Sequence, residues 1–287
     1  MTTPNRYAPR AQAVAAPSRN APGRRTVTPV RRRPATPPPS GNRKPLFLAG
    51  AAIASLAIGA TVLNFITKPD PDAPTAGCVI AVDAQGSAST MRDAYRQWLP
   101  SQAEECAAAN RANLSIALVS GETRTSTVTP VTGNLADLDY TGNDTNDKTI
   151  AANEIDRVVK EADEAILAAP KQEGGTDIVG ALCVAHDLLR GHSPSTLIIF
   201  SDGIHYREPY LLTKVPLDDA SVTQYVDALK ADGQLCDLTG TQVKMYGVGI
   251  GSGTSKMSDE QLAGVRRFWE AVIRATGANL VTYQRNP

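Results

Sequence analysis

Residues 78–87 of the chain read CVIAVDAQGS, and this stretch decides the predicted fold. An apolar run ends at an aspartate, Asp83, and small and polar residues follow it. Such a run is typical of a parallel strand that is buried on both faces. In open α/β sheets, ligands bind beyond the carboxyl ends of the strands. The stretch therefore predicts that Asp83 lies at the rim of a sheet, where a binding site would form.

The chain from residue 78 onward alternates apolar, β-branched runs with amphipathic stretches. Helices and strands that alternate in this way predict an α/β fold, with a doubly wound, mostly parallel sheet and helices on both faces. Strands are expected at residues 78–82, 114–119, 125–131, 196–200, 243–249 and 279–283. Helices are expected at residues 90–110, 149–168, 178–189, 218–231 and 258–275.

Two helix starts carry local signals. Ser89 is a candidate N-cap for the first helix, and Pro100 predicts a bend within it. The polar stretch 137–148 lacks the glycine and glutamate spacing of a calcium-binding loop. We therefore interpret this stretch as a turn followed by a helix cap.

The charge of the chain is unevenly distributed. Residues 1–45 contain ten Arg or Lys and no Asp or Glu, although the whole chain holds 29 of each kind. A segment rich in Arg, Pro and Ala buries too little apolar surface to order itself, so we expect a disordered basic tail. Because Tyr7 is the one aromatic residue in this tail, base stacking is poorly supported and nucleic acid is not expected as a partner.

An uncharged stretch follows the basic tail. Residues 46–66 read LFLAGAAIASLAIGATVLNFI, which is long enough for one transmembrane helix. The basic residues before it predict a cytoplasmic N-terminus in the cell membrane. A short linker, residues 67–77, would then lead to an extracytoplasmic domain at residues 78–287. A buried helix is the alternative, and a cleaved signal peptide fits poorly behind so long a tail.

Two later loops are predicted to meet Asp83 at the same rim. Residues 174–177 read GGTD, and residues 197–203 read LIIFSDG. Carboxylate, hydroxyl and amide oxygens of this kind suit a hard cation such as Mg²⁺ or Mn²⁺, and zinc is a poor candidate. The oxygen-bearing side chains of these three loops are therefore the candidate ligands.

At these residues the sequence resembles the von Willebrand factor type A domain and its metal-ion-dependent adhesion site. That family has an Asp-x-Ser-x-Ser motif after the first strand, a Thr in a second loop and an Asp in a third. Here Asp83, Ser87, Thr176 and Asp202 match these positions, whereas Gln85 replaces the first Ser. The resemblance implies binding without catalysis, in which the metal takes a carboxylate from a partner protein.

Two other classes of function compete with this interpretation. In the first, Asp83 and Asp202 cap helices in a metal-free structural or assembly component of an envelope complex. In the second, the chain is a Mg²⁺-dependent phosphohydrolase, but that chemistry needs a second Asp where Gln85 stands. Because no Ser–His pair and no nucleophilic Cys are visible, an enzyme is not expected. His205 follows Asp202 in a loop that we expect to be mobile.

Four cysteines lie in the predicted outer domain, and an even number in an oxidising compartment favours disulfides. Cys78, Cys106 and Cys236 are all expected near the amino-terminal edge of the sheet. The preferred bridge is Cys78–Cys106. Cys183 lies among apolar residues of a helix, where a buried reduced thiol is the better interpretation.

Overall fold

The structure of this protein is a computed structural model that describes residues 75–108, 111–170, 175–213 and 217–287. The predicted tail, the predicted membrane span and most of the linker lie outside these residues. Within the described ranges, no helix is both long and apolar enough to cross a membrane. The unit Phe65–Pro287 is compact.

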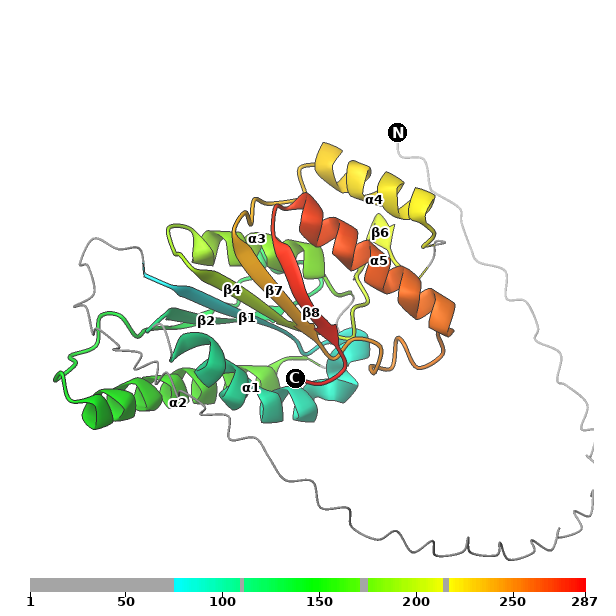
Figure 1. The fold of residues 1–287 in the computed structure, drawn as a ribbon. Helices are drawn as coiled ribbons and strands as arrows, with labels where there is room; N and C mark the ends of the chain where they lie inside the picture. The colour runs from blue at the N-terminus through cyan, green and yellow to red at the C-terminus, as the bar shows by residue number, and fades with distance from the viewer. Residues whose placement is uncertain (1–74, 109–110, 171–174, 214–216) are drawn as a thin grey trace, which may run out of the picture. The chain divides into compact units, whose positions relative to one another are not determined.

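A six-stranded sheet forms the centre of this unit, with the strand order β3-β2-β1-β4-β7-β8 (Figure 1). Neighbouring strands are parallel except β2 and β3, which are antiparallel. The expected α/β class and mostly parallel sheet are thus confirmed. The strands are β1 (Gly77–Asp83), β2 (Asn113–Val119), β3 (Val131–Asn134), β4 (Ser195–Phe200), β7 (Thr241–Tyr246) and β8 (Asn279–Gln284).

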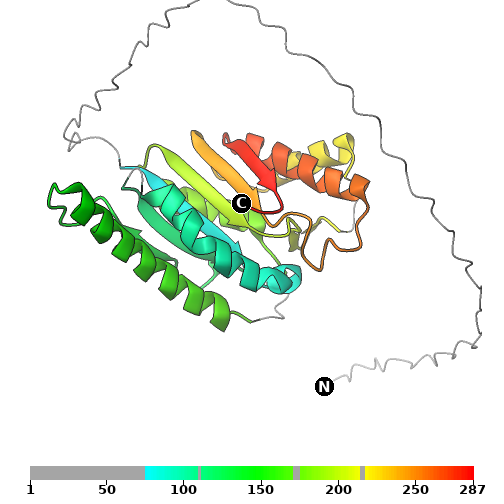
Figure 2. The same cartoon turned by 60° about the horizontal axis from the view of Figure 1, so that its bottom comes forward.

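Helices cover both faces of the sheet, as Figures 1 and 2 show. One face packs against α1 (Arg92–Ala107) and α2 (Asp144–Ala168). The other packs against α3 (Ile178–Leu189), α4 (Asp219–Ala231) and α5 (Asp259–Ala275). Each face has its own apolar cluster. Both clusters lie within the described residues, so we expect residues 65–287 to fold without the preceding chain.

Strand β1 joins the two clusters. All seven of its residues are buried. Val79 belongs to the cluster beneath α3, α4 and α5, whereas Ile80 belongs to the cluster beneath α1 and α2. This alternation arises because successive side chains of a strand point to opposite faces. An unbroken apolar run is therefore what a central strand requires, and it delivers Asp83 to the carboxyl edge of the sheet.

Two helices begin elsewhere than expected. A 3₁₀ helix (Gly86–Met91) precedes α1, and Ser89 donates to the Gly86 carbonyl instead of capping the helix. Helix α2 starts five residues before the expected position because the Asn143 side chain accepts hydrogen bonds from the backbone of Thr145 and Asn146. Residues 137–148 do contain a turn and a helix cap. The cap is Asn143, so the helix begins inside this stretch and not after it.

The edge strand and the loop after Asp202 also differ from expectation. The strand expected at residues 125–131 begins instead at Val131, immediately after Pro130, which cannot donate to a ladder. Residues 123–125 form a 3₁₀ turn. The loop through Tyr210 forms a small hairpin of β5 (Tyr206–Arg207) and β6 (Tyr210–Leu211), and His205 before it is buried.

All four cysteines form disulfides. Cys78–Cys106 is the preferred bridge and is confirmed. The interpretation of Cys183 as a reduced thiol is wrong, because Cys183 bonds to Cys236. The segment after α4 lies against α3, where the His186 ring also contacts the Asp237 carbonyl. The apolar neighbours of Cys183 in its helix could not show which loop packs against it.

Candidate functional site

Two buried carboxylates lie at the ends of neighbouring strands. Asp83 ends β1, and Asp202 lies two residues beyond the end of β4. Both side chains belong to residues that are 0% exposed. The Ser201 hydroxyl donates a hydrogen bond of 2.9 Å to Asp83 Oδ2, and the Gln85 backbone N–H lies 3.4 Å from Oδ1. The parallel pairing of β1 and β4 is what brings the two strand ends together.

Asp202 is only half satisfied. Its Oδ1 accepts a hydrogen bond of 3.0 Å from the Ile204 backbone N–H. Its Oδ2 is buried and has no partner with hydrogen-bond geometry among the described residues. Burial raises the pKa of Asp202, and the nearby Ser87 hydroxyl and Gly253 backbone offset part of that rise. Oδ2 therefore lies near polar groups without a hydrogen bond of good geometry to a described residue.

Burial governs the electrostatics of this pair. Loss of water raises the pKa of Asp83 well above its usual value, and the charge of Asp202 raises it further. Burial likewise raises the pKa of Asp202. No Arg, Lys or His forms an ion pair with either carboxylate in the part of the chain that the structure describes. Burial of this kind favours the neutral, protonated carboxyl groups, whereas a bound cation would favour their charged forms.

The hydroxyl residues of the prediction lie beside these carboxylates. A Cβ on Gly86 would lie 3.4 Å from Thr176 Oγ1, so Thr176 is next to the loop after β1. A Cβ on Gly253 would lie 2.9 Å from Ser87 Oγ and 3.1 Å from Asp202 Oδ2. The fold thus brings the predicted set Asp83, Ser87, Thr176 and Asp202 to one edge.

Gln85 behaves differently from the rest of the predicted set. It is 6% exposed, and its Oε1 is buried without a hydrogen-bond partner among the described residues. It lines a cavity of about 240 Å³ together with Leu118, Val128 and residues at the end of α2. Gln85 contacts Asp83 through its backbone N–H and not through its side chain.

The loop after β7 was not predicted as part of the site. The Ser252 backbone N–H and hydroxyl both donate to the Ser87 carbonyl, at 3.1 and 3.0 Å. A Cβ on Gly251 would lie 2.4 Å from Asp202 Oδ2, so only glycine fits there without movement. Residues 249–254, which read GIGSGT, therefore pack against Asp202 and Ser87. The alternating glycines Gly249, Gly251 and Gly253 shortly after β7 were the sequence signal that could have indicated this loop.

Tyr95 approaches the carboxylates from α1 and was also missed. Its hydroxyl is buried without a hydrogen-bond partner among the described residues. Burial raises its pKa, and the charges of Asp83 and Asp202 raise it further. A tyrosine in a helix gives no sequence signal for such a position.

A second buried cluster stands next to Thr176. Asp177 caps α3 by accepting from Gly180 N–H at 2.7 Å, and its other oxygen forms an ion pair with Arg207 at 2.8 Å. His205 is 1% exposed, and burial, followed by the charge of Arg207, lowers its pKa to about 3. This cluster attaches the β5–β6 hairpin to the loop that carries Thr176, where Thr176 and Tyr206 exchange two backbone hydrogen bonds of 2.9 Å.

The donor set limits which cation could bind. Within the described ranges, no three His, Cys, Asp or Glu side chains gather in a metal-binding arrangement. Two carboxylates with hydroxyl oxygens remain, which suits Mg²⁺ or Mn²⁺ and does not suit zinc. Comparison with models of known protein families and with curated proteins finds no match for this chain. A function can therefore be inferred only from the arrangement of Asp83, Ser87, Thr176 and Asp202 and from the sequence motif.

Proposed function

We propose that this chain is a membrane-anchored binding module resembling the von Willebrand factor type A domain. In this proposal its outer domain engages a protein partner through a divalent cation at the carboxyl edge of the sheet. Asp83, Ser87 and Asp202 are the proposed ligands, with Thr176 as the contribution of the second loop. The partner would present a carboxylate to the open position of the cation.

The single observation that carries the proposal is the pair Asp83 and Asp202. Both are fully buried, neither has a cationic partner among the described residues, and Asp202 Oδ2 is unsatisfied. Burial of an uncompensated charge is costly, so such a pair is retained where a bound cation offsets it. A metal-free docking module is the second candidate. The loop at residues 249–254 favours it, because Gly251 and Gly253 pack against Asp202 Oδ2.

Calorimetric titration of residues 65–287 with Mg²⁺ and Mn²⁺ tests the proposal. Saturable binding is expected, with loss in Asp83→Asn and in Asp202→Asn. Asp218→Asn is the matched control, because Asp218 is an exposed cap of α4 whose side chain accepts a hydrogen bond from the Ser221 backbone. Gln85→Ser restores the hydroxyl of the family motif and should bind more tightly. Absence of binding in the unmodified domain rejects the cation and leaves the docking module.

A further inference from the structure

A cavity of about 240 Å³ lies between the end of β2 and the end of α2. Six of its nine lining residues are apolar, and the other three are Gln85, Ser120 and Ser126. An engineered protein cavity of about 150 Å³ with apolar walls is known to bind benzene. The cavity beside α2 is therefore large enough for an aromatic ring and apolar enough to favour one.

The short pairing of β3 with β2 leaves this space open. β3 pairs with β2 only along Asn113–Ile116, because β3 begins at Val131, after Pro130. Leu118 lies two residues further along β2, beyond this pairing, and packs against the apolar cluster beneath α1 and α2. Val128, in the segment before β3, also lines the cavity and is 51% exposed. An apolar ligand in the cavity would remove this side chain from water.

Gln85 contributes a buried acceptor to the cavity. It is 6% exposed, and its Oε1 has no hydrogen-bond partner among the described residues. The hydroxyl oxygens of Ser120 and Ser126 differ, because each accepts a hydrogen bond from a backbone N–H two residues further along, at 3.3 and 3.2 Å. A buried acceptor without a partner is costly. A ligand that donates one hydrogen bond to Gln85 Oε1 would therefore gain affinity from it.

Arg92 fixes two walls of the cavity. Its buried side chain donates to the Ala84 carbonyl, next to Gln85, at 2.6 Å and to the Pro170 carbonyl, after α2, at 2.8 Å. One guanidinium thus joins the loop after β1 to the end of α2. Walls that are held together in this way form the cavity before a ligand arrives, and this lowers the cost of binding.

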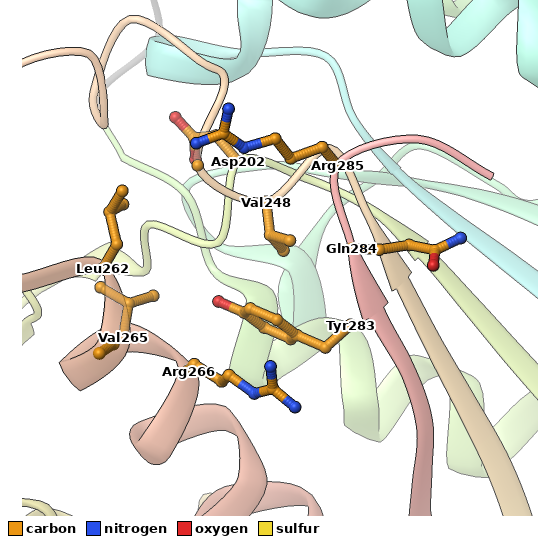
Figure 3. A pocket seen from close by; sticks show the side chains of 10 residues that line it. Asp202, Val248, Leu262, Val265, Arg266, Tyr283, Gln284 and Arg285 are labelled. Carbon is orange, nitrogen blue, oxygen red and sulfur yellow. The ribbon is translucent and has the colours of Figure 1, made fainter. Parts of the chain in front are cut away.

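This cavity is separate from the candidate cation site. None of the proposed cation ligands lines it, and Gln85 contacts Asp83 through its backbone N–H and not through its side chain. The cavity of about 250 Å³ in Figure 3 is different, because Asp202 forms part of its lining. No residue lines both cavities. The cavity beside α2 thus offers a binding site that needs no metal.

We propose that the cavity beside α2 binds an aromatic ligand with one hydrogen-bond donor, of the indole or phenol class. The ring lies against Leu118 and Val128, and its N–H or O–H donates to Gln85 Oε1. Such a ring combines a large apolar body with a single donor, which matches the apolar walls and the single open acceptor. It reaches the cavity either as a free small molecule or as a side chain of a partner protein.

Nuclear magnetic resonance of ¹⁵N-labelled residues 65–287 in EDTA tests this proposal. Indole is the probe, and 1-methylindole, which lacks the N–H donor, is its control. At about 1 mM, indole should shift the backbone amides of residues 84–86 and 118–120 and the side-chain amide of Gln85. The control should bind about two- to tenfold more weakly, because it cannot donate to Oε1. Absence of shifts at these residues, or equal affinity for the two rings, overturns the proposal.

Matched variants assign the binding to the cavity. Gln85→Met keeps the length of the side chain and removes the acceptor, so it should weaken indole about two- to tenfold and leave 1-methylindole unchanged. Ala165→Leu should fill the cavity and abolish binding of both rings. Ala152→Leu makes the same change at an exposed position of α2 and should leave both affinities unchanged. Indole binding that survives both cavity variants contradicts the assignment.

Acetyl-tryptophanamide distinguishes the two sources of the ring. It carries the indole group with a peptide bond on either side, as in a partner protein. Affinity at least equal to that of indole assigns the cavity to a partner's side chain. Binding of indole without binding of acetyl-tryptophanamide assigns it to a free small molecule. Because EDTA removes divalent cations, these outcomes do not depend on the proposed cation site.

Discussion

The Ser201 hydroxyl donates a hydrogen bond to Asp83 Oδ2 and thereby joins the end of β4 to the end of β1. The next residue, Asp202, carries the second buried carboxylate. Ser201 thus stabilises the Asp83 carboxylate, and the adjacent Asp202 supplies the second carboxylate. Burial of the Asp83 and Asp202 carboxylates side by side should lower the stability of the fold.

In EDTA at pH 7, Asp83→Asn should stabilise residues 65–287 by about 1 kcal/mol, because it removes a buried charge that repels Asp202. The folded-state pKa of Asp83 lies above its unfolded value of 3.8. The wild type therefore gains stability as the pH falls towards 3.8, and the advantage of the variant shrinks over that range. Urea unfolding at several pH values measures this. A variant that is less stable than the wild type at pH 7 contradicts the account.

His205 should weaken the fold in acid. Its pKa is lowered to about 3 in the folded state from 6.5, so the unfolded chain takes up the proton first. Stability from this residue is present above pH 6.5 and is lost as the pH falls towards 3. Between pH 7 and pH 5 the wild type should lose about 2 kcal/mol relative to His205→Leu. Parallel pH profiles of the two proteins would argue against a buried neutral His205.

The Cys183–Cys236 disulfide should contribute strongly to stability, since it closes a separation of 53 residues. Replacement of both cysteines by alanine should cost about 4 kcal/mol on the chain-entropy estimate. The same change at Cys78 and Cys106, which are separated by 28 residues, should cost slightly less. Denaturant unfolding of the two double variants gives the comparison. A negligible loss in the first variant would mean that Cys183 is reduced.

Gly251→Ala should displace the loop at residues 249–254 that packs against Asp202. The added Cβ would lie 2.4 Å from Asp202 Oδ2, and we expect a loss of about 1–3 kcal/mol. Ser252→Ala in the same loop removes only an exposed hydroxyl that donates to the Ser87 carbonyl, so its effect should be clearly smaller. Urea unfolding of both variants measures the difference. Equal losses would mean that the loop does not pack on Asp202 as described.

Local pattern was sufficient for the sheet and for most of the candidate site. The apolar run before Asp83 and the LIIF run before Ser201 predict two buried parallel strands, and the rim follows from them. Helix α3 spans Ile178–Leu189, as its periodicity predicts. The boundary that shifted at Asn143 depends on which of several polar residues caps the helix, whereas α1 follows Met91 without a side-chain cap. Sequence alone offers several equivalent choices there.

Long-range packing could not be predicted in the same way. The bond between Cys183 and Cys236 and the packing of Gly251 against Asp202 join segments from different parts of the chain. Each depends on the path of a loop, and a loop carries no periodic signal. Gln85 was assigned to the cation from the motif, whereas its side chain lines a cavity beside α2.

The most direct test of the central claim is anomalous diffraction from crystals of residues 65–287 grown with Mn²⁺. The account predicts one strong anomalous peak within coordination distance of Asp83 or Asp202, with Ser87 beside it, and no such peak in Asp202→Asn crystals. A structure at high Mn²⁺ concentration without a peak between the two carboxylates would contradict the cation site. The carboxyl edge would then be a docking surface that functions without metal.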